Sequence, residues 1–571
     1  MFLTMTKLLD QIGNWNPQLF RELKGRFRRR NLAIAVGTSL VAQIMMLLGY
    51  SGGLPDPLLR ETYNRYCTGY NDEYWRSTYQ CISTAAGDAW QVNWQLWNFD
   101  LFVGLSMLGA VVLLVIGSHL ISADLIKEEK RGTLGFVRLS PQALHRIIIG
   151  KILGVPSLIY LGIALALPLH LWVGLQAGIT LPWIGMVDLV IIGACIASYS
   201  LATLISFVGQ DFFGGFQSWL YSGSLGFYLM VTSIMGFDSN FPVNNSFDWL
   251  RLFYPGNIFY YIVDSNSLEP EVIHYFEPSG LFSTEFFHST AWSTGFLGLV
   301  LMAGHYFVLT SISWEGIQRR FYEPQATIIS KRTGYIAAIL TTFMLVGFVA
   351  VGNRDYRLLG NFEGLQVFYL LLFFTLTFCL TPKRQRVQDW FRDRQTSRYA
   401  KQFWSDLLWG DRSPALLAIA VMLAFSTGIM AIVAIKDPLV TETGAVLVGL
   451  TLQAGFLFIC ACIVQLIFLQ TRKQGVLLVV SLSTLTIAPF LVYIIFNHRF
   501  PSVVALGLFS AFPINAAVDA VAHLALWAIA GQCIAMISGA WYIQRSIQNI
   551  GASELKTLLT PPAESSKNML T

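Results

Sequence analysis

The chain has 571 residues, a net charge of +5, and 54% hydrophobic against only 12% charged residues. A soluble globular domain carries about 25% charged residues, so this composition excludes one and predicts an all-α polytopic membrane protein. Its 38 lysines and arginines are spread over several loops instead of one soluble face, so the positive charge does not indicate a nucleic-acid partner.

The N-terminal segment, residues 1–30, is predicted to be cytosolic and to contain an amphipathic helix from Asn16 to Arg30. Asn16 is a favourable N-cap, and Pro17 suits the first helical position. Apolar residues, Leu19 among them, follow one helical face and basic residues surround the other. This pattern predicts an interfacial helix in contact with membrane lipid. The segment lacks the pattern of a cleavable signal peptide, so the first span is expected to stay in place.

Apolar runs predict about twelve transmembrane helices arranged as two six-helix halves. The first half, residues 31–332, has runs at residues 32–50, 100–120, 148–173, 186–208, 216–235 and 291–311. The second half, residues 333–543, has runs at residues 335–351, 365–380, 415–435, 445–469, 476–496 and 517–543. With flanking residues and tilt, such runs are long enough to cross a hydrocarbon core of about 30 Å.

The charges of the loops orient these spans. Most of the lysines and arginines fall in segments assigned to the cytosol, including the loop at residues 381–413. The segments at residues 51–99 and 237–290 are rich in acidic residues and are predicted to lie outside. Both termini, including the polar tail at residues 544–571, are then cytosolic. We expect a multi-pass protein of a bacterial inner (plasma) membrane.

The segment at residues 51–99, predicted to lie outside, contains the only two cysteines that fall outside apolar runs, Cys67 and Cys81. Thiols exposed to an oxidising exterior tend to pair. We therefore expect a disulfide between them, with two unpaired thiols as the alternative.

The segment at residues 121–151 joins the second and third spans and is basic, so it is expected on the cytosolic side. A helix leaving the membrane is predicted to stop at Gly132, because glycine accepts the left-handed conformation that ends helices. A new helix is predicted to begin with Ser140 as N-cap and Pro141 at its first position. The intervening apolar residues are Leu134, Phe136, Val137 and Leu139. An apolar cluster at the cytosolic surface indicates a protein partner.

This segment resembles the loop between the second and third spans of type-2 ABC exporter permeases. The pattern of that family, E-x-x-R-G-T-L … L-(S/T)-P … G-K-x-L, is matched by residues 128–134, 139–141 and 150–153. The resemblance implies a fold with an elbow helix before the first span, and a coupling segment that docks on a separate ABC ATPase subunit. ATP would bind to that partner, and this chain would bind no cofactor. The residues that the resemblance assigns to coupling are Glu128, Glu129, Arg131, Gly132, Thr133, Leu134 and Phe136.

The loop at residues 381–413 lacks the Glu-x-x-Arg-Gly-Thr pattern. Two questions therefore stay open: whether the second half also contacts the ATPase, and whether the chain pairs with a second permease copy.

Motifs for catalysis are absent from the sequence: there is no G-x-x-x-x-G-K-[ST] phosphate loop, H-E-x-x-H or C-x-x-C. We predict neither an enzyme nor a metal site. Ionisable residues at membrane depth are the other functional candidates, namely His305, Asp519 and His523. Asp519 and His523 are four residues apart and are predicted to share a helical face, and a proton-coupled pathway would use such a pair. The alternative is that Asp519, near the outer end of its span, is solvated or hydrogen-bonded and has no role in transport. A secondary transporter is therefore one alternative to the exporter, and a non-transporting membrane scaffold for an ATPase is the other.

Overall fold

The computed structural model describes the chain in fourteen stretches. They are residues 11–56, 63–71, 78–83, 90–209, 215–237, 246–265, 286–287, 289, 295–349, 358–395, 403–436, 442–470, 474–496 and 503–559. The predicted tail at residues 544–571 is described only as far as residue 559.

Long helices make up most of the described chain. In the first half they are α3 (Arg29–Ser51), α4 (Trp94–Val111), a π-helical turn (Val112–Gly117), α5 (Ser118–Lys130), α8 (Ser157–Gln176), α9 (Leu181–Val208), α11 (Gln217–Phe237) and α15 (Gly295–Tyr322). In the second half they are α16 (Lys331–Val349), α17 (Leu358–Leu380), α20 (Leu416–Lys436), α21 (Thr443–Gln470), α22 (Gln474–Phe496) and α25 (Ala522–Leu559). The α4–π–α5 succession is one continuous span.

Short elements connect the long helices. They are α2 (Pro17–Arg26), β1 (Gly69–Asn71), β2 (Thr78–Gln80), α6 (Thr133–Arg138), α7 (Leu144–Gly154), α12 (Asp248–Arg251), α13 (Asn257–Ser265), α18 (Arg384–Gln395), α19 (Phe403–Trp409), α23 (Val504–Leu508) and α24 (Pro513–Asp519). The antiparallel β1–β2 hairpin is a small departure from the predicted all-α fold.

Among the described residues, ten helices are long and apolar enough to cross a membrane. The prediction of a multi-pass helical membrane protein is therefore confirmed. Helices α11 and α22 occupy the predicted fifth and eleventh spans but are not among the ten, so the count of twelve stays a prediction.

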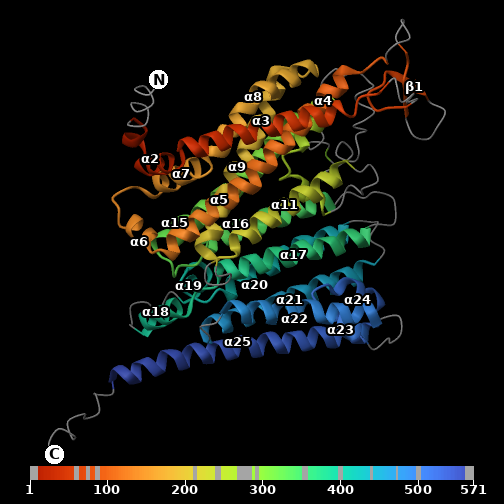
Figure 1. Ribbon diagram of the computed structural model, residues 1–571. Coiled ribbons are helices and arrows are strands. Elements are labelled where there is room, and N and C mark those ends of the chain that lie inside the picture. Colours follow the sequence, from red (N-terminus) through yellow and green to blue (C-terminus); the bar gives the residue numbers. More distant parts are fainter. Residues whose placement is uncertain are drawn as a thin grey trace, which may run out of the picture.

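The long helices lie side by side in a row that runs from α3 and α8 at one edge to α25 at the other (Figure 1). Helices α2, α6, α7 and α18 lie at one end of these helices, and the β1 strand lies at the opposite end. The segments predicted to be cytosolic thus share one end of the molecule, away from the hairpin predicted to lie outside.

Two large apolar clusters form the core. The first is built mainly from α4, α8, α9, α13 and α15. The second is built mainly from α16, α17, α20 and α21, but it also includes Leu134 of α6, Ile147 of α7 and Phe321 of α15. The short helices after the second span therefore pack into the same cluster as the second half.

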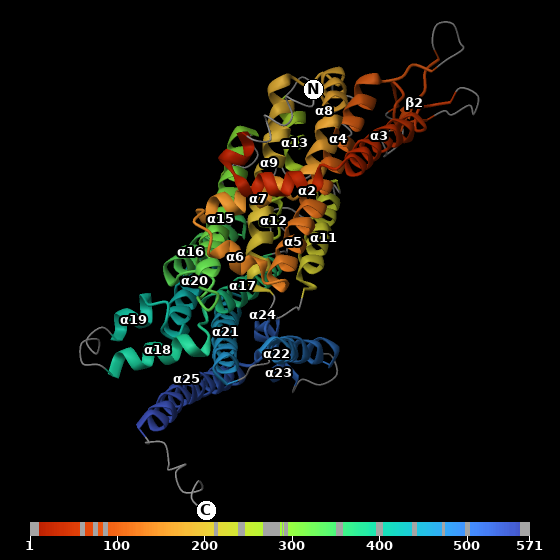
Figure 2. The ribbon, with the colours of Figure 1, turned by 60° about the vertical axis from the view of Figure 1, so that its left-hand side comes forward.

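The third span begins later than predicted. The sequence suggests one run at residues 148–173, but α7 ends at Gly154 and α8 begins at Ser157. Pro156, between them, has no N–H to donate to the Ile152 carbonyl, which accepts from the Tyr160 hydroxyl at 2.9 Å instead, and the ψ of Pro156, 13°, lies outside the helical region. The break lets α7 take a different direction from α8 (Figure 2).

The segment at residues 237–290, predicted as an exterior loop, contributes to the core. Its helix α13 buries Ile258, Tyr261 and Ile262 completely within the first apolar cluster. In α12, Arg251 is buried and lies 3.3 Å from the carboxylate of the buried Asp248. A nine-residue helix is too short for its hydrophobic pattern to separate it from a loop in the sequence.

The disulfide between Cys67 and Cys81 is present, with the two Cα atoms 4.8 Å apart. It links the residues that flank the β1–β2 hairpin, and both cysteines are buried against Trp90. The predicted pairing is therefore confirmed.

Replacing both Cys67 and Cys81 with serine is expected to lower the free energy of unfolding of the segment that contains the β1–β2 hairpin. The expected loss is about 3 kcal/mol, because the reduced chain regains the entropy of an open loop. Limited proteolysis of the segment, together with mass spectrometry of the non-reduced protein, measures this. A Cys195→Ser variant is the control, since Cys195 is a free, buried thiol. Alkylation of Cys67 and Cys81 without prior reduction would contradict the prediction.

Candidate functional site

The predicted helix stop at Gly132 is confirmed. Helix α5 ends at Lys130, and Gly132 has φ 71°, in the left-handed region that favours glycine. Its N–H donates to the carbonyl of Glu129 at 2.9 Å. The hydroxyl of Thr133 donates to the carbonyl of Glu128 at 3.0 Å, so the chain turns directly into α6.

The predicted helix start at Ser140 and Pro141 is wrong. Helix α7 begins at Leu144, after Ala143, and has no side-chain cap. The hydroxyl of Ser140 instead donates to the carbonyl of Val137 at 2.8 Å and closes the end of α6. A serine hydroxyl can cap either the helix that precedes it or the helix that follows it, and here it caps the preceding helix, α6.

The apolar residues of α6 and of the position that follows it, Leu139, are divided between the interior and the surface. Leu134 is buried in the second apolar cluster, and the guanidinium of Arg138 lies 5.6 Å from the ring centre of Phe321 in α15. In contrast, Phe136 is 78% exposed and Leu139 is 85% exposed. We call these two residues the exposed pair. Of the other predicted coupling residues, Arg131, Gly132 and Thr133 are exposed and Glu129 is half-buried.

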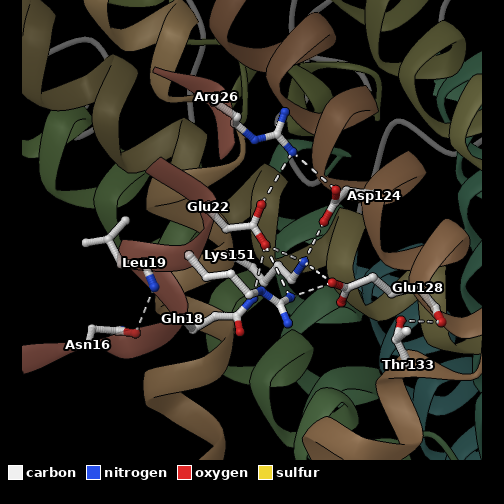
Figure 3. A network of polar contacts seen from close by, with 10 residues as sticks. Asn16, Gln18, Leu19, Glu22, Arg26, Asp124, Glu128, Thr133 and Lys151 are labelled. Atoms are coloured by element: carbon white, nitrogen blue, oxygen red, sulfur yellow. Dashed lines mark hydrogen bonds and ion pairs between the residues drawn. The ribbon is translucent and has the colours of Figure 1, made fainter. Parts of the chain in front are cut away.

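Behind α6, the ammonium group of Lys151 in α7 contacts three carboxylates. Its Nζ lies 2.7 Å from Glu22 Oε1 of α2, 2.6 Å from Asp124 Oδ2 of α5 and 2.8 Å from Glu128 Oε1 of α5 (Figure 3). The Lys151 side chain is only 2% exposed. Glu128, which the resemblance assigns to coupling, therefore faces the interior.

Two arginines of α2 complete this group. Arg21 lies 2.6 Å from Glu128, and Arg26 lies 3.2 Å from Asp124. The group therefore contains three acidic and three basic side chains. We call it the Lys151 cluster; its members are Arg21, Glu22, Arg26, Asp124, Glu128 and Lys151. Buried charges are costly unless they are paired; here each carboxylate has at least one basic partner, and these pairs join α2, α5 and α7.

The electrostatics of the cluster keep Lys151 charged. Burial alone would lower the pKa of Lys151, but the carboxylates of Asp124 and Glu22 outweigh it and raise the pKa above its usual value of 10.5. The three carboxylates are close enough together to hold a metal ion. The Lys151 ammonium already occupies the position between them, so the arrangement fits a structural ion network.

Two glycines of α7 allow α2 to lie directly against it. A Cβ atom at Gly150 would lie 2.8 Å from Asn16 Oδ1, and one at Gly154 would lie 2.5 Å from the Cβ of Glu22. Asn16 uses both ends of its amide, accepting from the Leu19 N–H at 3.0 Å and donating to the Arg146 carbonyl at 2.7 Å.

Helix α2 has the predicted Asn16 cap and Pro17 at its first position, but it ends at Arg26, before the predicted Arg30. Leu19, predicted on the lipid-facing side, is buried instead. The helix is therefore held at least partly by protein contacts.

A Gly154→Leu variant is expected to displace α2 from α7 and to cost about 1–3 kcal/mol of stability, as overpacking does. Spin labels introduced as unnatural amino acids at Lys24 and His145 should report a longer and broader distance. The matched control is Gly25→Leu in α2, since a Cβ at Gly25 would meet no atom within 4 Å. Equal distance distributions in both variants would show that α2 does not depend on this close approach.

The membrane-depth candidates are not brought together. His305 Nδ1 lies 2.7 Å from the carbonyl of Leu301 in its own helix. Asp519 ends α24, and Ala520 has an extended conformation (ψ 136°), so Asp519 and His523 do not share a helical face as predicted. Asp519 instead accepts a hydrogen bond from Tyr493 at 2.9 Å.

The loop at residues 381–413 forms α18 and α19, which lie near the end of α15. A cavity of about 810 Å³ lies between them. The charged side chains that line it include two ion pairs: Arg319 is 2.9 Å from Asp411, and Arg412 is 3.6 Å from Asp393. The cavity lining is thus of mixed charge and favours neither anions nor cations.

Glu22 and the pairing of Lys151 with acidic groups are not predicted from the sequence above. One signal was available: a lysine within an apolar run requires carboxylates nearby, and Asp124 and Glu128 are four residues apart on one helix. The third carboxylate is 129 residues away from Lys151 in the chain, where no local pattern points to it.

No family model, curated protein or solved structure matches the chain. Its function must therefore be inferred from its own residues and their arrangement.

Proposed function

We propose that the chain is the membrane permease subunit of an ATP-driven exporter of the type-2 ABC kind. In this proposal it has twelve spans, both termini lie in the cytosol of a bacterial cell, and α2 is the interfacial elbow helix. The cytosolic ends of α5, α6 and α7 dock on a separate ATPase subunit that binds ATP. The observation that carries the proposal is the exposed pair, Phe136 and Leu139, at the tip of α6.

Large apolar side chains at a water-facing surface are unfavourable unless a partner covers them. The exposed pair lies beside a left-handed turn at Gly132, in the segment that resembles the coupling element of the family. Helix α6 lies at the same end of the long helices as α2, α7 and α18 (Figure 1). A protein partner there explains the exposure of the two residues.

The contacts of α5, α6 and α7 suggest how a movement of α6 would be transmitted to the membrane-spanning helices. Leu134 connects α6 to the apolar cluster that contains Phe321 of α15 and the helices of the second half. The Lys151 cluster connects α5 and α7 to α2, which leads directly into α3. Closure of a partner ATPase dimer would therefore move several spans together, as rigid bodies, between inward-open and outward-open states.

The two alternative functions, a secondary transporter and a non-transporting scaffold, require different features of the chain. A secondary transporter would use Asp519 and His523 on one helical face, and the break at Ala520 separates these residues. A scaffold without transport would keep the docking surface, so a transport assay separates it from an exporter. Contact of α18 and α19 with the same ATPase, and pairing with a second permease copy, would add to the docking surface without changing its role.

A photocrosslinking amino acid placed at Phe136 in the full chain, in native membranes, tests the proposal. The expected product is a crosslink to a protein that carries a G-x-x-x-x-G-K-[ST] phosphate-binding loop. The control position is Ile534 in α25, which is 70% exposed on a long apolar helix and is expected to give crosslinks to lipid only. Crosslinks from Phe136 only to lipid would show that the exposed pair is inserted in the membrane and would reject the docking site.

A further inference from the structure

Three helices of the first half enclose a groove of about 420 Å³. Helix α3 lies against α8 and α4 at one edge of the row (Figure 1), and none of the residues of α3 is buried. The groove residues are Asn31, Ile34, Ala35, Thr38, Ser39, Ala42 and Gln43 of α3; Leu105, Leu108, Gly109, Val112 and Ile116 of the second span; and Leu158, Ile159, Gly162, Ile163 and Ala166 of α8.

The chemistry of the groove fits a hydrocarbon chain. Small residues such as Ala35, Gly109 and Gly162 leave space where the helices meet, and an unfilled space of this kind loses dispersion contacts. Three of the four polar side chains on its wall have hydrogen-bond partners: Asn31 Nδ2 donates to the Arg26 carbonyl at 2.9 Å, Ser39 Oγ to the Gly162 carbonyl at 2.7 Å, and Gln43 Nε2 to Ser39 Oγ at 3.1 Å. The rest of the wall, apart from Thr38, is apolar, so an apolar occupant fits it.

The dimensions of the groove match one leaflet. Its α3 wall runs from Asn31 to Gln43, which is about 18 Å of helix at 1.5 Å per residue. Half of a hydrocarbon core of about 30 Å is roughly 15 Å. In the orientation proposed above, α3 starts at the inner surface, so the groove lies in the inner leaflet.

Three consecutive arginines stand at the inner end of the groove. Arg28, Arg29 and Arg30 immediately precede Asn31, and all three are exposed. Within the described part of the chain, none of their side chains has an ion-pair partner, in contrast to Arg21 and Arg26 in the Lys151 cluster. Basic groups at this level attract the phosphate of anionic lipids.

We propose that this groove is a binding site for an anionic phospholipid of the inner leaflet. One acyl chain lies along α3 between α4 and α8, and the headgroup phosphate is bound by the arginines at positions 28–30. This site is separate from the docking surface on α6, so it stands whether or not an ATPase binds there.

Native mass spectrometry of the delipidated full chain, titrated with phosphatidylglycerol or with phosphatidylcholine of identical acyl chains, tests the proposal. We expect one phosphatidylglycerol to bind at concentrations at which phosphatidylcholine does not. The triple variant Arg28→Gln, Arg29→Gln, Arg30→Gln should weaken phosphatidylglycerol binding at least about tenfold. Filling the groove with Ala35→Phe, or with the milder Ala42→Leu, should weaken it with the arginines intact.

The charge-matched control is the triple variant Arg332→Gln, Arg392→Gln, Arg545→Gln, which removes three exposed arginines that do not line the groove. It is expected to keep the wild-type affinity. Three results would each overturn the proposal: equal binding of the two lipids to the wild type, an equal loss in the two arginine variants, or unchanged binding in both groove-filling variants. The first would identify ordinary annular lipid, and the second a general effect of net charge.

Discussion

Replacing Lys151 with methionine is expected to lower the free energy of unfolding by about 3–5 kcal/mol, the cost of removing one partner from a buried ion network. The variant leaves the carboxylates of Glu22, Asp124 and Glu128 close together with only the two arginines of α2 beside them. Their mutual repulsion is then only partly compensated. Thermal unfolding in lipid nanodiscs measures the loss, and spin labels on α2 and α7 show whether α2 separates.

A second substitution distinguishes charge imbalance from lost packing. Lys151→Met combined with Glu22→Gln restores an equal number of acidic and basic groups, and apolar or neutral replacements of a whole buried pair are often tolerated. The double variant should therefore recover most of the stability that Lys151→Met loses. If the double variant is as unstable as the single one, the cluster does not act through its charges.

The wild-type cluster should also be insensitive to mild alkali. The pKa of Lys151 is raised above 10.5, so the stability it contributes is fully present below its ordinary pKa and is lost only as the pH rises through the raised value. Melting temperatures that fall between pH 7 and 9 in the wild type but not in the double variant would contradict this.

The second large effect is expected from Phe136→Asp, which should abolish stimulation of the partner's ATP hydrolysis while the protein still folds and inserts. Phe136 is 78% exposed, so the change leaves the interior intact. An aromatic residue at the centre of an interface contributes at least about 2 kcal/mol, or roughly 30-fold in affinity. ATP hydrolysis by the reconstituted complex, as a function of the concentration of the partner ATPase, measures this.

Trp15→Asp is the matched control for Phe136→Asp, because Trp15 is also a large apolar residue, 58% exposed, near the same end of the molecule. It should leave the stimulation unchanged. Normal stimulation in the Phe136 variant would remove the exposed pair from the docking surface and with it the main support for the proposed function.

The features predicted correctly are those that a short stretch of sequence determines. Long apolar runs identify membrane-spanning helices, and Gly132 ends α5 because its left-handed conformation suits glycine almost alone. The pairing of Cys67 and Cys81 could be predicted by elimination, because the other five cysteines lie in apolar runs. Each of these inferences needs only local chemistry.

The wrong and missing predictions depend on contacts between distant segments. The hydroxyl of Ser140 could cap either α6 or α7, and the packing of α6 decides that it donates to a carbonyl of α6. The breaks at Pro156 and Ala520 are different, because they lie within runs that hydropathy treats as continuous; Pro156 is a local signal that hydropathy alone does not weigh. Glu22 meets Lys151 only because glycines of α7 allow α2 to approach, which no composition or periodicity reveals.

The Lys151 cluster also imposes an order on biogenesis. Glu22 leaves the ribosome 129 residues before Lys151, which at about 5–20 residues per second corresponds to roughly 6–26 s of synthesis. During that time the second span has to enter the membrane, and the acidic and basic groups of α2 must stay hydrated at its surface without their ammonium partner. Helix α2 can attach to α7 only after α7 has emerged from the ribosome. While α2 is still waiting for α7, the third span, which follows α7 in the chain, has not yet reached the membrane.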